Sequence, residues 1–132
     1  GKAWVSLGDG LATLEQWAES EAAYRQAVSL RPAHAASWAS LGNAQEELLD
    51  VAAAEASWRK AVALEPAEMG GAWQNLGGLL RRADRMAESR AAYEAAVRVE
   101  PNSVEAYIGL GKCYQAPAGG LASGSQEASD RN

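Results

Sequence analysis

The stretch that decides the fold is WASLGNAQEELLDVAAAEASWRKAVALEP, which runs from Trp38 to Pro66. Moved back by 34 residues, its Trp, Leu-Gly, aromatic, Ala and Pro positions fall on the same kinds of residue within 4–32. Moved forward by 35 residues, they do so again within 73–101, and a fourth copy begins at Tyr107 without being completed. Self-similarity at such a period is typical of stacked supersecondary units and predicts a solenoid.

Each copy predicts a pair of helices. Its apolar residues recur at spacings of three and four, which places them on one face of a helix. Each full copy ends at a proline, and the residue before a proline disfavours the helical region. The predicted fold class is therefore all-α, an α-solenoid of antiparallel helix pairs. Seven helices are expected, at residues 2–14, 16–30, 36–48, 51–64, 72–83, 86–99 and 104–115.

A glycine recurs after the leucine of every copy, at Gly8, Gly42, Gly77 and Gly111. Glycine inside a helix costs roughly 0.5–1 kcal/mol relative to alanine, so its recurrence predicts that two helices approach closely there. The chain has no phenylalanine, so Trp and Tyr are expected to fill the wider gaps between the helices.

The spacing between the second and third copies is one residue longer than that between the first two. The extra residue falls in the sequence AEMGG, which ends in Gly70 and Gly71. Because glycine accepts unusual backbone angles, we expect a loose loop there and a small change of angle between the two units.

The composition argues against two kinds of partner, nucleic acids and membranes. The chain has 132 residues and a net charge of −5, and it lacks the clustered Lys and Arg that nucleic acids or anionic membranes require. No apolar run approaches the length of a membrane-spanning helix. We therefore expect no nucleic-acid or membrane partner and a cytoplasmic location. Because the chain does not begin with Met, it is expected to be a fragment of a longer protein.

No residue pattern predicts catalysis, a metal or a cofactor. His34 is the single histidine and follows a proline, so it is expected to be a solvated loop side chain. Cys113 is the single cysteine; it has no partner for a zinc site or an internal disulfide and is expected to pack as a small hydrophobe. We accordingly predict that the chain is not an enzyme.

These residues resemble the tetratricopeptide repeat, whose pattern is W-x2-L-G-x2-Y…A-x3-F…P with a period of 34 residues. The resemblance covers residues 1–116, and residues 117–132 are expected to form a disordered tail. It divides the first part into repeats 1–34, 35–68 and 70–103 and a half repeat or capping helix, 104–116. It implies a right-handed superhelix whose concave face is lined by the first helix of each pair. Such a face usually holds an extended peptide or a helix of a partner protein.

The departures from the family pattern are few. Gln45 stands where an apolar residue is usual, and Ser20 and Ser89 stand where alanine is usual. The turn between the paired helices often contains glycine in the family, but here it carries Glu15, Leu49 and Asp84.

The resemblance also implies which residues line the groove, because they lie on the face of each first helix that packing does not use. Asn43 and Asn75 are expected to hold the ligand backbone, since an amide both donates and accepts hydrogen bonds. Acidic residues gather toward one end and basic residues toward the other. The alternative is that Asn is simply common at these positions and that the charged residues are only solvated. The predicted groove residues are Ser6, Asp9, Ser40, Asn43, Glu47, Gln74, Asn75, Arg82 and Lys112.

Two more specific sites of the family do not fit. Co-chaperones of similar sequence hold a terminal Glu-Glu-Val-Asp carboxylate with two Asn flanked by Lys and Arg. Asn43 and Asn75 match, but the cations would fall at Ala39, Glu105 and Gly109. The superhelix of O-GlcNAc transferase has a ladder of Asn on its inner face, of which one rung in four matches here.

The predicted function is therefore a non-catalytic protein-interaction module or scaffold that binds a protein or peptide segment. One alternative is the recognition arm of a larger enzyme, such as an O-GlcNAc transferase-like glycosyltransferase with a catalytic domain beyond Asn132. A third is a structural array that self-associates through Tyr107 and Ile108 of the last helix.

Overall fold

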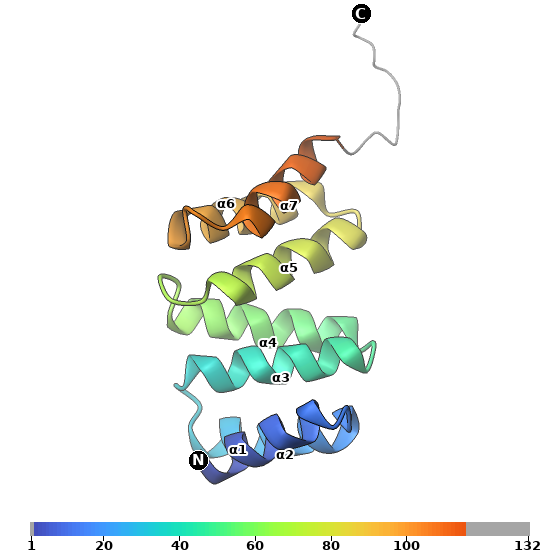
Figure 1. Ribbon diagram of the computed structural model, residues 1–132, viewed down its shortest axis with the longest axis vertical. Coiled ribbons are helices and arrows are strands. Elements are labelled where there is room, and N and C mark those ends of the chain that lie inside the picture. The colour runs from blue at the N-terminus through green and yellow to red at the C-terminus, as the bar shows by residue number, and fades with distance from the viewer. Residues whose placement is uncertain (1, 116–132) are drawn as a thin grey trace, which may run out of the picture.

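The computed structural model describes residues 2–115, and the tail predicted at 117–132 lies outside the described residues. These residues form helices and short connections without any strand, so the all-α prediction is confirmed. The helices stack along the long axis of the molecule (Figure 1). They are α1 (Lys2–Thr13), α2 (Trp17–Leu30), α3 (Ala35–Glu47), α4 (Val51–Leu64), α5 (Gly70–Arg82), α6 (Met86–Val99) and α7 (Val104–Gln115).

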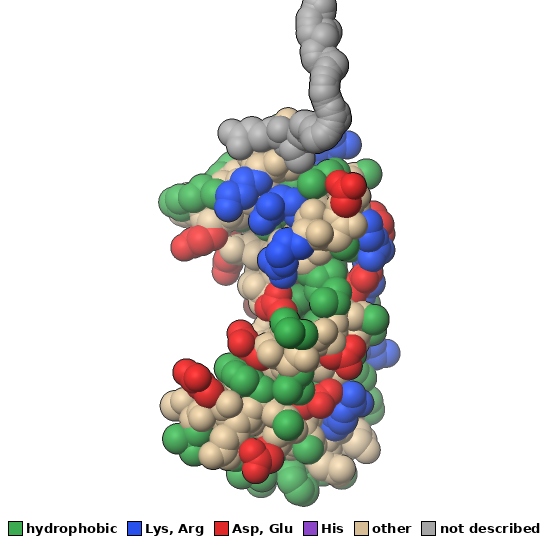
Figure 2. Space-filling view, turned by 90° about the vertical axis from the view of Figure 1, so that its right-hand side faces the viewer, with side chains coloured by type: hydrophobic (Ala, Val, Ile, Leu, Met, Phe, Trp, Pro, Cys, Tyr) green, Lys and Arg blue, Asp and Glu red, His purple; other side chains and the backbone are tan. Residues whose placement is uncertain are grey.

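The first helices of the pairs share one side of the stack. Each pair, α1/α2, α3/α4 and α5/α6, packs on the next, and α7 lies against α5 and α6. Figure 1 places α1, α3, α5 and α7 in front of their partners, and Figure 2 shows the molecule hollowed along that side. The stack therefore has a concave face formed by the first helices.

The expected loop at Gly70 and Gly71 is wrong, because both glycines belong to α5. α3 begins three residues after Pro32 and α5 begins four residues after Pro66, so the extra residue lies before the helix. A Cβ on Gly70 would lie 2.7 Å from the side chain of Glu100, so this glycine makes room for a neighbour and does not form a flexible turn.

The tight turns within the pairs use left-handed residues. Glu15, Leu49 and Asp84 have φ values of 60°, 63° and 63°. The amide of the following residue then reaches back to the helix, as in the 2.9 Å bond from Gln16 N to Leu11 O. This is the Schellman arrangement, which usually places glycine at the left-handed position.

The predicted close approach at the recurring glycines is confirmed in the first three copies. A Cβ on Gly42 would lie 2.6 Å from the indole of Trp58, and Gly8 and Gly77 meet a tyrosine ring in the same way. For Gly111 the prediction is wrong, since nothing in residues 2–115 lies within 4 Å of its Cβ position. In α7 it is Gly109 that packs against an aromatic ring.

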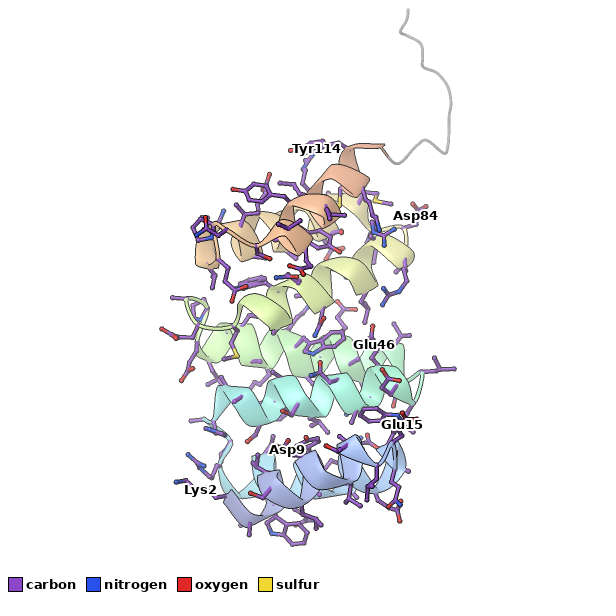
Figure 3. All side chains as sticks on the ribbon, viewed as in Figure 1. Lys2, Asp9, Glu15, Glu46, Asp84 and Tyr114 are labelled. Atoms are coloured by element: carbon purple, nitrogen blue, oxygen red, sulfur yellow. The ribbon has the colours of Figure 1, made fainter. Side chains whose placement is uncertain are left out.

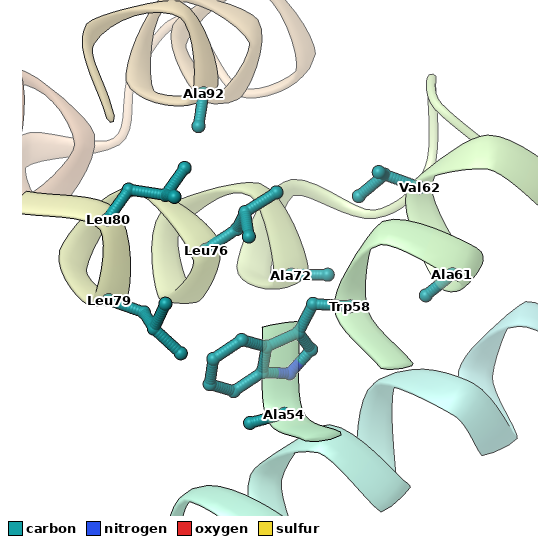
Figure 4. Packing of buried hydrophobic residues seen from close by; sticks show 9 residues of the cluster. All are labelled: Ala54, Trp58, Ala61, Val62, Ala72, Leu76, Leu79, Leu80 and Ala92. Atoms are coloured by element: carbon teal, nitrogen blue, oxygen red, sulfur yellow. The ribbon is translucent and has the colours of Figure 1, made fainter. Parts of the chain in front are cut away.

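The largest core cluster joins the second and third repeats. Trp58 is fully buried in one cluster with Leu76, Leu79 and Leu80 of α5, and Figure 4 shows Leu79 beside its indole. An aromatic side chain buries about 150–250 Å², which at roughly 25 cal/mol per Å² contributes about 4–6 kcal/mol before entropy is subtracted. This aromatic therefore fixes α5 against α4.

The polar residues that replace apolar ones in the family pattern, Ser20, Ser89 and Gln45, all form buried hydrogen bonds. Ser20 and Ser89 donate to the carbonyl oxygens of Gly8 and Gly77, at 2.8 and 2.6 Å. Gln45 is 2% exposed and has two partners. It accepts from Ser57 Oγ at 2.6 Å, and its amide donates to Glu21 of the preceding repeat at 3.3 Å.

A tryptophan at the start of two first helices ties each repeat to the one before it. Trp38 Nε1 donates to the carbonyl of Pro32 at 2.8 Å, and Trp73 Nε1 donates to that of Pro66 at 3.0 Å. A hydrogen bond thus links the proline that ends one repeat to the tryptophan near the start of the next.

Candidate functional site: the groove of the first helices

The predicted groove residues come from all four first helices. Most of their side chains are exposed, and the half-buried exceptions are Ser40 and Gln74. Figure 3 labels Asp9 on α1, together with Glu46, the neighbour of Glu47 on α3. Ser6 and Asp9 belong to α1; Ser40, Asn43 and Glu47 to α3; Gln74, Asn75 and Arg82 to α5; and Lys112 to α7.

Three of these residues share one pocket. Ser40 and Asn43 of α3 and Asn75 of α5 line a cavity of about 290 Å³ between the two helices. Its other walls are small or flexible side chains, among them Ala39 and Met69. Small residues on the first helices thus leave a depression between repeats two and three, with polar groups on both sides.

The two asparagines are linked to each other. Asn75 Nδ2 donates to Asn43 Oδ1 at 3.0 Å, and the same oxygen accepts from Trp58 Nε1 at 3.2 Å. Within the described residues the amide nitrogen of Asn43 and the carbonyl oxygen of Asn75 make no further hydrogen bond. The pair therefore presents donors and an acceptor side by side, which are the groups that match a peptide unit.

Other predicted residues are held away from this pocket. Gln74 Nε2 donates to Ser103 Oγ at 3.1 Å, which ties α5 to the start of α7. Arg82 Nη2 pairs with Glu46 at 2.6 Å, so one end of this guanidinium is held across α3 and α5. The structure brings neither Gln74 nor Arg82 to the asparagine pair.

Asp9 has a partner within its own repeat, the hydroxyl of Tyr24. Burial, followed by the hydrogen bond to Asp9, raises the pKa of Tyr24 to about 12. The hydroxyl therefore stays protonated and donates to the carboxylate throughout the neutral range.

Tyr24 and Trp58 were missing from the predicted site. Both belong to second helices and pack as core residues, but their polar tips reach the groove. The chain lacks phenylalanine, and a Tyr or Trp stands at each position where the family pattern has Phe. That substitution was the signal, because an added hydroxyl or N–H needs a partner when the ring is buried.

An ion network covers the second helices on another face. Glu55 of α4 pairs with Arg59 at 2.9 Å and with Arg85 at 2.8 Å, and both arginines also reach Glu88. The hydrogen bond from Arg85 lowers the pKa of Glu55 below its usual value. Arg85, at the start of α6, thus links the second repeat to the third.

The remaining candidates for chemistry have structural partners. His34 is half-buried and its Nδ1 lies 2.6 Å from Ser37 Oγ, so the expectation of a freely solvated loop side chain is wrong. Cys113 is buried as expected, 3.2 Å from Ser89 Oγ. Residues 2–115 contain no cluster of His, Cys, Asp or Glu suited to a metal ion. Within the same stretch no helix is both long and apolar enough to cross a membrane.

Two family models, both described as tetratricopeptide repeat, match the chain at residues 5–68 and 70–113. The chain belongs to the tetratricopeptide repeat family. A search of curated protein sequences finds no match.

Solved structures of tetratricopeptide repeat domains share the fold. The first such domain of Spaghetti (RPAP3), solved with an HSP90 peptide of sequence SRMEEVD, is 24% identical with a TM-score of 0.83. That match covers 88% of this chain and 91% of the other. The domain of Arabidopsis OM64 is 21% identical with a TM-score of 0.81 and coverages of 86% and 93%. MamA has the same identity and TM-score, with coverages of 86% and 66%.

Proposed function

We propose that this chain is a protein-interaction module that binds an extended segment of a partner protein in the groove lined by α1, α3, α5 and α7. The observation that favours it most is the pocket between α3 and α5, where the amide nitrogen of Asn43 and the carbonyl oxygen of Asn75 have no partner within residues 2–115 and lie beside small side chains. A peptide backbone presents the complementary donors and acceptors. The similar domain of Spaghetti, which is bound to a peptide, supports the same class of ligand.

The ligand we propose is an internal segment of a partner, not its carboxyl terminus. At the positions of the family's terminal-carboxylate site this chain has Ala39, Glu105 and Gly109, none of which is a cation. Ala39 lines the pocket, Glu105 is acidic, and Gly109 is buried in packing. A terminal carboxylate would therefore meet no positive charge beside the asparagine pair.

The test is a selection of random peptides displayed on phage, run in parallel on the wild type and on Asn43→Ala/Asn75→Ala. The variant should fold, because Trp58 Nε1 also donates to the carbonyl of Ala39 and keeps that partner. We expect a shared peptide motif on the wild type and at least about tenfold weaker binding by the variant, since each hydrogen bond contributes about 0.5–1.5 kcal/mol. Gln26→Ala on the exposed face of α2 is the matched control and should bind as the wild type does. Selected peptides that bind the double variant equally well would refute the groove as the site.

A further inference from the structure

The aromatic tips that reach the groove are satisfied in the same way in the first two repeats. Tyr24 donates to Asp9, and Trp58 donates to Asn43. Both acceptors occupy the position directly after the recurring glycine of their repeat. In these two repeats the residue after the recurring glycine therefore supplies the oxygen that accepts from the buried aromatic donor.

The third repeat breaks this rule. The aromatic residue is Tyr93, and the residue after the recurring glycine is Gly78, which has no side chain to accept with. The following helix also contributes glycine, because Gly109 packs on the Tyr93 ring where the earlier interfaces have Ser40 and Asn75. The tip of this tyrosine thus lies between two glycines.

A second donor lies beside it. Arg82 Nη1 and Tyr93 Oη are each 3.3 Å from the point that a Cβ on Gly78 would occupy. The other end of the guanidinium is anchored, since Arg82 Nη2 pairs with Glu46 at 2.6 Å. Within residues 2–115 no acceptor bonds to the Tyr93 hydroxyl, and Tyr93 is 7% exposed. A hydroxyl and a cation therefore meet where the other repeats hold an oxygen acceptor.

We propose that this place, the Gly78 site (Gly78, Arg82, Tyr93 and Gly109), binds the side-chain carboxylate of an Asp or Glu in the bound segment. The inference rests on the proposed function and adds the chemistry of one ligand residue. The ligand supplies from outside the group that Asp9 supplies to Tyr24 from within the chain. A carboxylate is favoured over a neutral carbonyl because hydrogen bonds from a guanidinium to an ionised acceptor are roughly twice as strong.

The charge of the surrounding surface agrees with an acidic ligand residue. Lys112 occupies in α7 the repeat position that Gly78 occupies in α5, and its side chain is exposed. Figure 2 shows Lys and Arg side chains gathered beside the hollow at the α5–α7 end of the molecule. Asp9 occupies that position in α1, so an acidic residue would be repelled at the other end of the groove.

The experiment uses peptides selected on the wild-type chain, synthesised with an amidated carboxyl terminus so that only side chains carry carboxylates. Each acidic residue is replaced in turn, Asp→Asn or Glu→Gln, and binding is measured by fluorescence anisotropy. The protein variants are Tyr93→Phe, which removes one hydroxyl, and the control Gln26→Ala, on the exposed face of α2.

We expect one acidic peptide position at which the amide replacement weakens binding about 10-fold to 100-fold, as for a hydrogen bond to a charged group. Tyr93→Phe should weaken binding of the acidic peptide by about tenfold and that of its amide form hardly at all. Gln26→Ala should change neither. If the acidic and amide peptides bind equally, or if Tyr93→Phe affects both alike, the inference is overturned while the groove proposal stands.

A second probe keeps the inference testable without a selected peptide. Sodium acetate is titrated into the ¹⁵N-labelled chain, and the amide signals of Gly77, Gly78 and Gly109 are followed, with acetamide as the neutral control. Shifts with acetate that disappear in Tyr93→Phe would support the Gly78 site even if no peptide were selected and the proposed function failed. The absence of such shifts together with the absence of any selected peptide would overturn both.

Discussion

The buried pair Gln45 and Ser57 offers the most decisive test of how this array is held together. In the neighbouring repeats the equivalent positions hold Leu and Ala, as in Leu80 and Ala92. Here the Ser57 hydroxyl donates to the Gln45 side chain at 2.6 Å, and both residues are nearly inaccessible. Ser57→Ala leaves a buried amide oxygen without its donor. We therefore predict that the single change is destabilising and that adding Gln45→Leu to it restores stability.

The size of the effect follows from the asymmetry of hydrogen bonding. An unpaired buried acceptor costs about 1–3 kcal/mol, whereas replacing both partners by apolar groups is close to neutral. We expect Ser57→Ala to lose about 2 kcal/mol. The double variant should lie within about 0.5 kcal/mol of the wild type, because the apolar pair of the other repeats replaces the hydrogen bond. The coupling energy between the two changes is then about 1–3 kcal/mol, well above the usual error for independent sites.

Thermal unfolding followed by circular dichroism measures this cycle. At about 2.1 cal/mol/K per residue, the 114 described residues have an unfolding entropy of about 240 cal/mol/K, so 1 kcal/mol shifts Tm by about 4 °C. Ser57→Ala should lower Tm by about 8 °C and the double variant should recover it. If the two changes are additive, the hydrogen bond contributes nothing specific and the reasoning is refuted.

Four further changes test the fold. Gly42→Ala should destabilise by about 1–3 kcal/mol because its Cβ would lie 2.6 Å from a buried indole. Gly10→Ala, where nothing lies within 4 Å, should stabilise by about 0.5–1 kcal/mol; equal effects in urea unfolding would contradict the packing argument. Leu49→Gly should stabilise by about 1 kcal/mol, since the residue is exposed with φ at 63°, and an unchanged urea midpoint would count against strain there. Glu55→Gln should cost about 0.5–1 kcal/mol at pH 7. Its pKa is lowered in the folded state by Arg85, so this contribution is present above the ordinary pKa of Glu, is lost as the pH falls through the lowered folded-state pKa, and should shrink in high salt; a cost that is as large in acid, with the carboxyl protonated, as at pH 7 would be evidence against the ion pair.

The sequence predicted the helix pairs because these depend on residues that repeat, and the resemblance to the tetratricopeptide repeat then implied the concave face. Leu41 and Leu76 recur at one spacing and are almost fully buried, so a single pattern describes both. Residues on the opposite side of the same helices are then exposed by default. Together with the geometry implied by the resemblance, that inference placed Asn43 and Asn75 on a shared surface.

The connections between helices were less predictable. Gly70 and Gly71 were expected to form a loop because glycine accepts many backbone angles. In the structure the fourth residue of both α3 and α5 is the tryptophan that bonds to the preceding proline carbonyl, Trp38 and Trp73. The same hydrogen bond between tryptophan and proline sets where α3 and α5 start, and the extra residue lies in the connection before α5. A local preference of glycine was overridden by a contact between repeats.

The hydrogen-bond partners of the groove residues also could not be predicted from the sequence. Asn43 was expected to face a ligand with both of its groups, but its oxygen is taken by Trp58 and Asn75. Gln74 and Asn75 are adjacent in sequence, yet the first bonds to Ser103 and the second to Asn43. The hydrogen-bond partner of each side chain lies about 30 residues away in the sequence, and the periodic pattern does not predict which partner that is.

Positions that fail to repeat carry most of the information about function in this chain. The residue after the recurring glycine is Asp9, Asn43, Gly78 and Lys112 in the four copies, and no packing requirement explains the series, since the three that have side chains are exposed. The aromatic donor beneath it is nevertheless kept in every completed repeat. A donor that is retained while its acceptor changes from a carboxylate to an amide and then to nothing is what a groove needs if its polarity is to vary along a bound segment. The repeat therefore determines where the proposed groove lies, and on this proposal the differences between its copies determine what it binds.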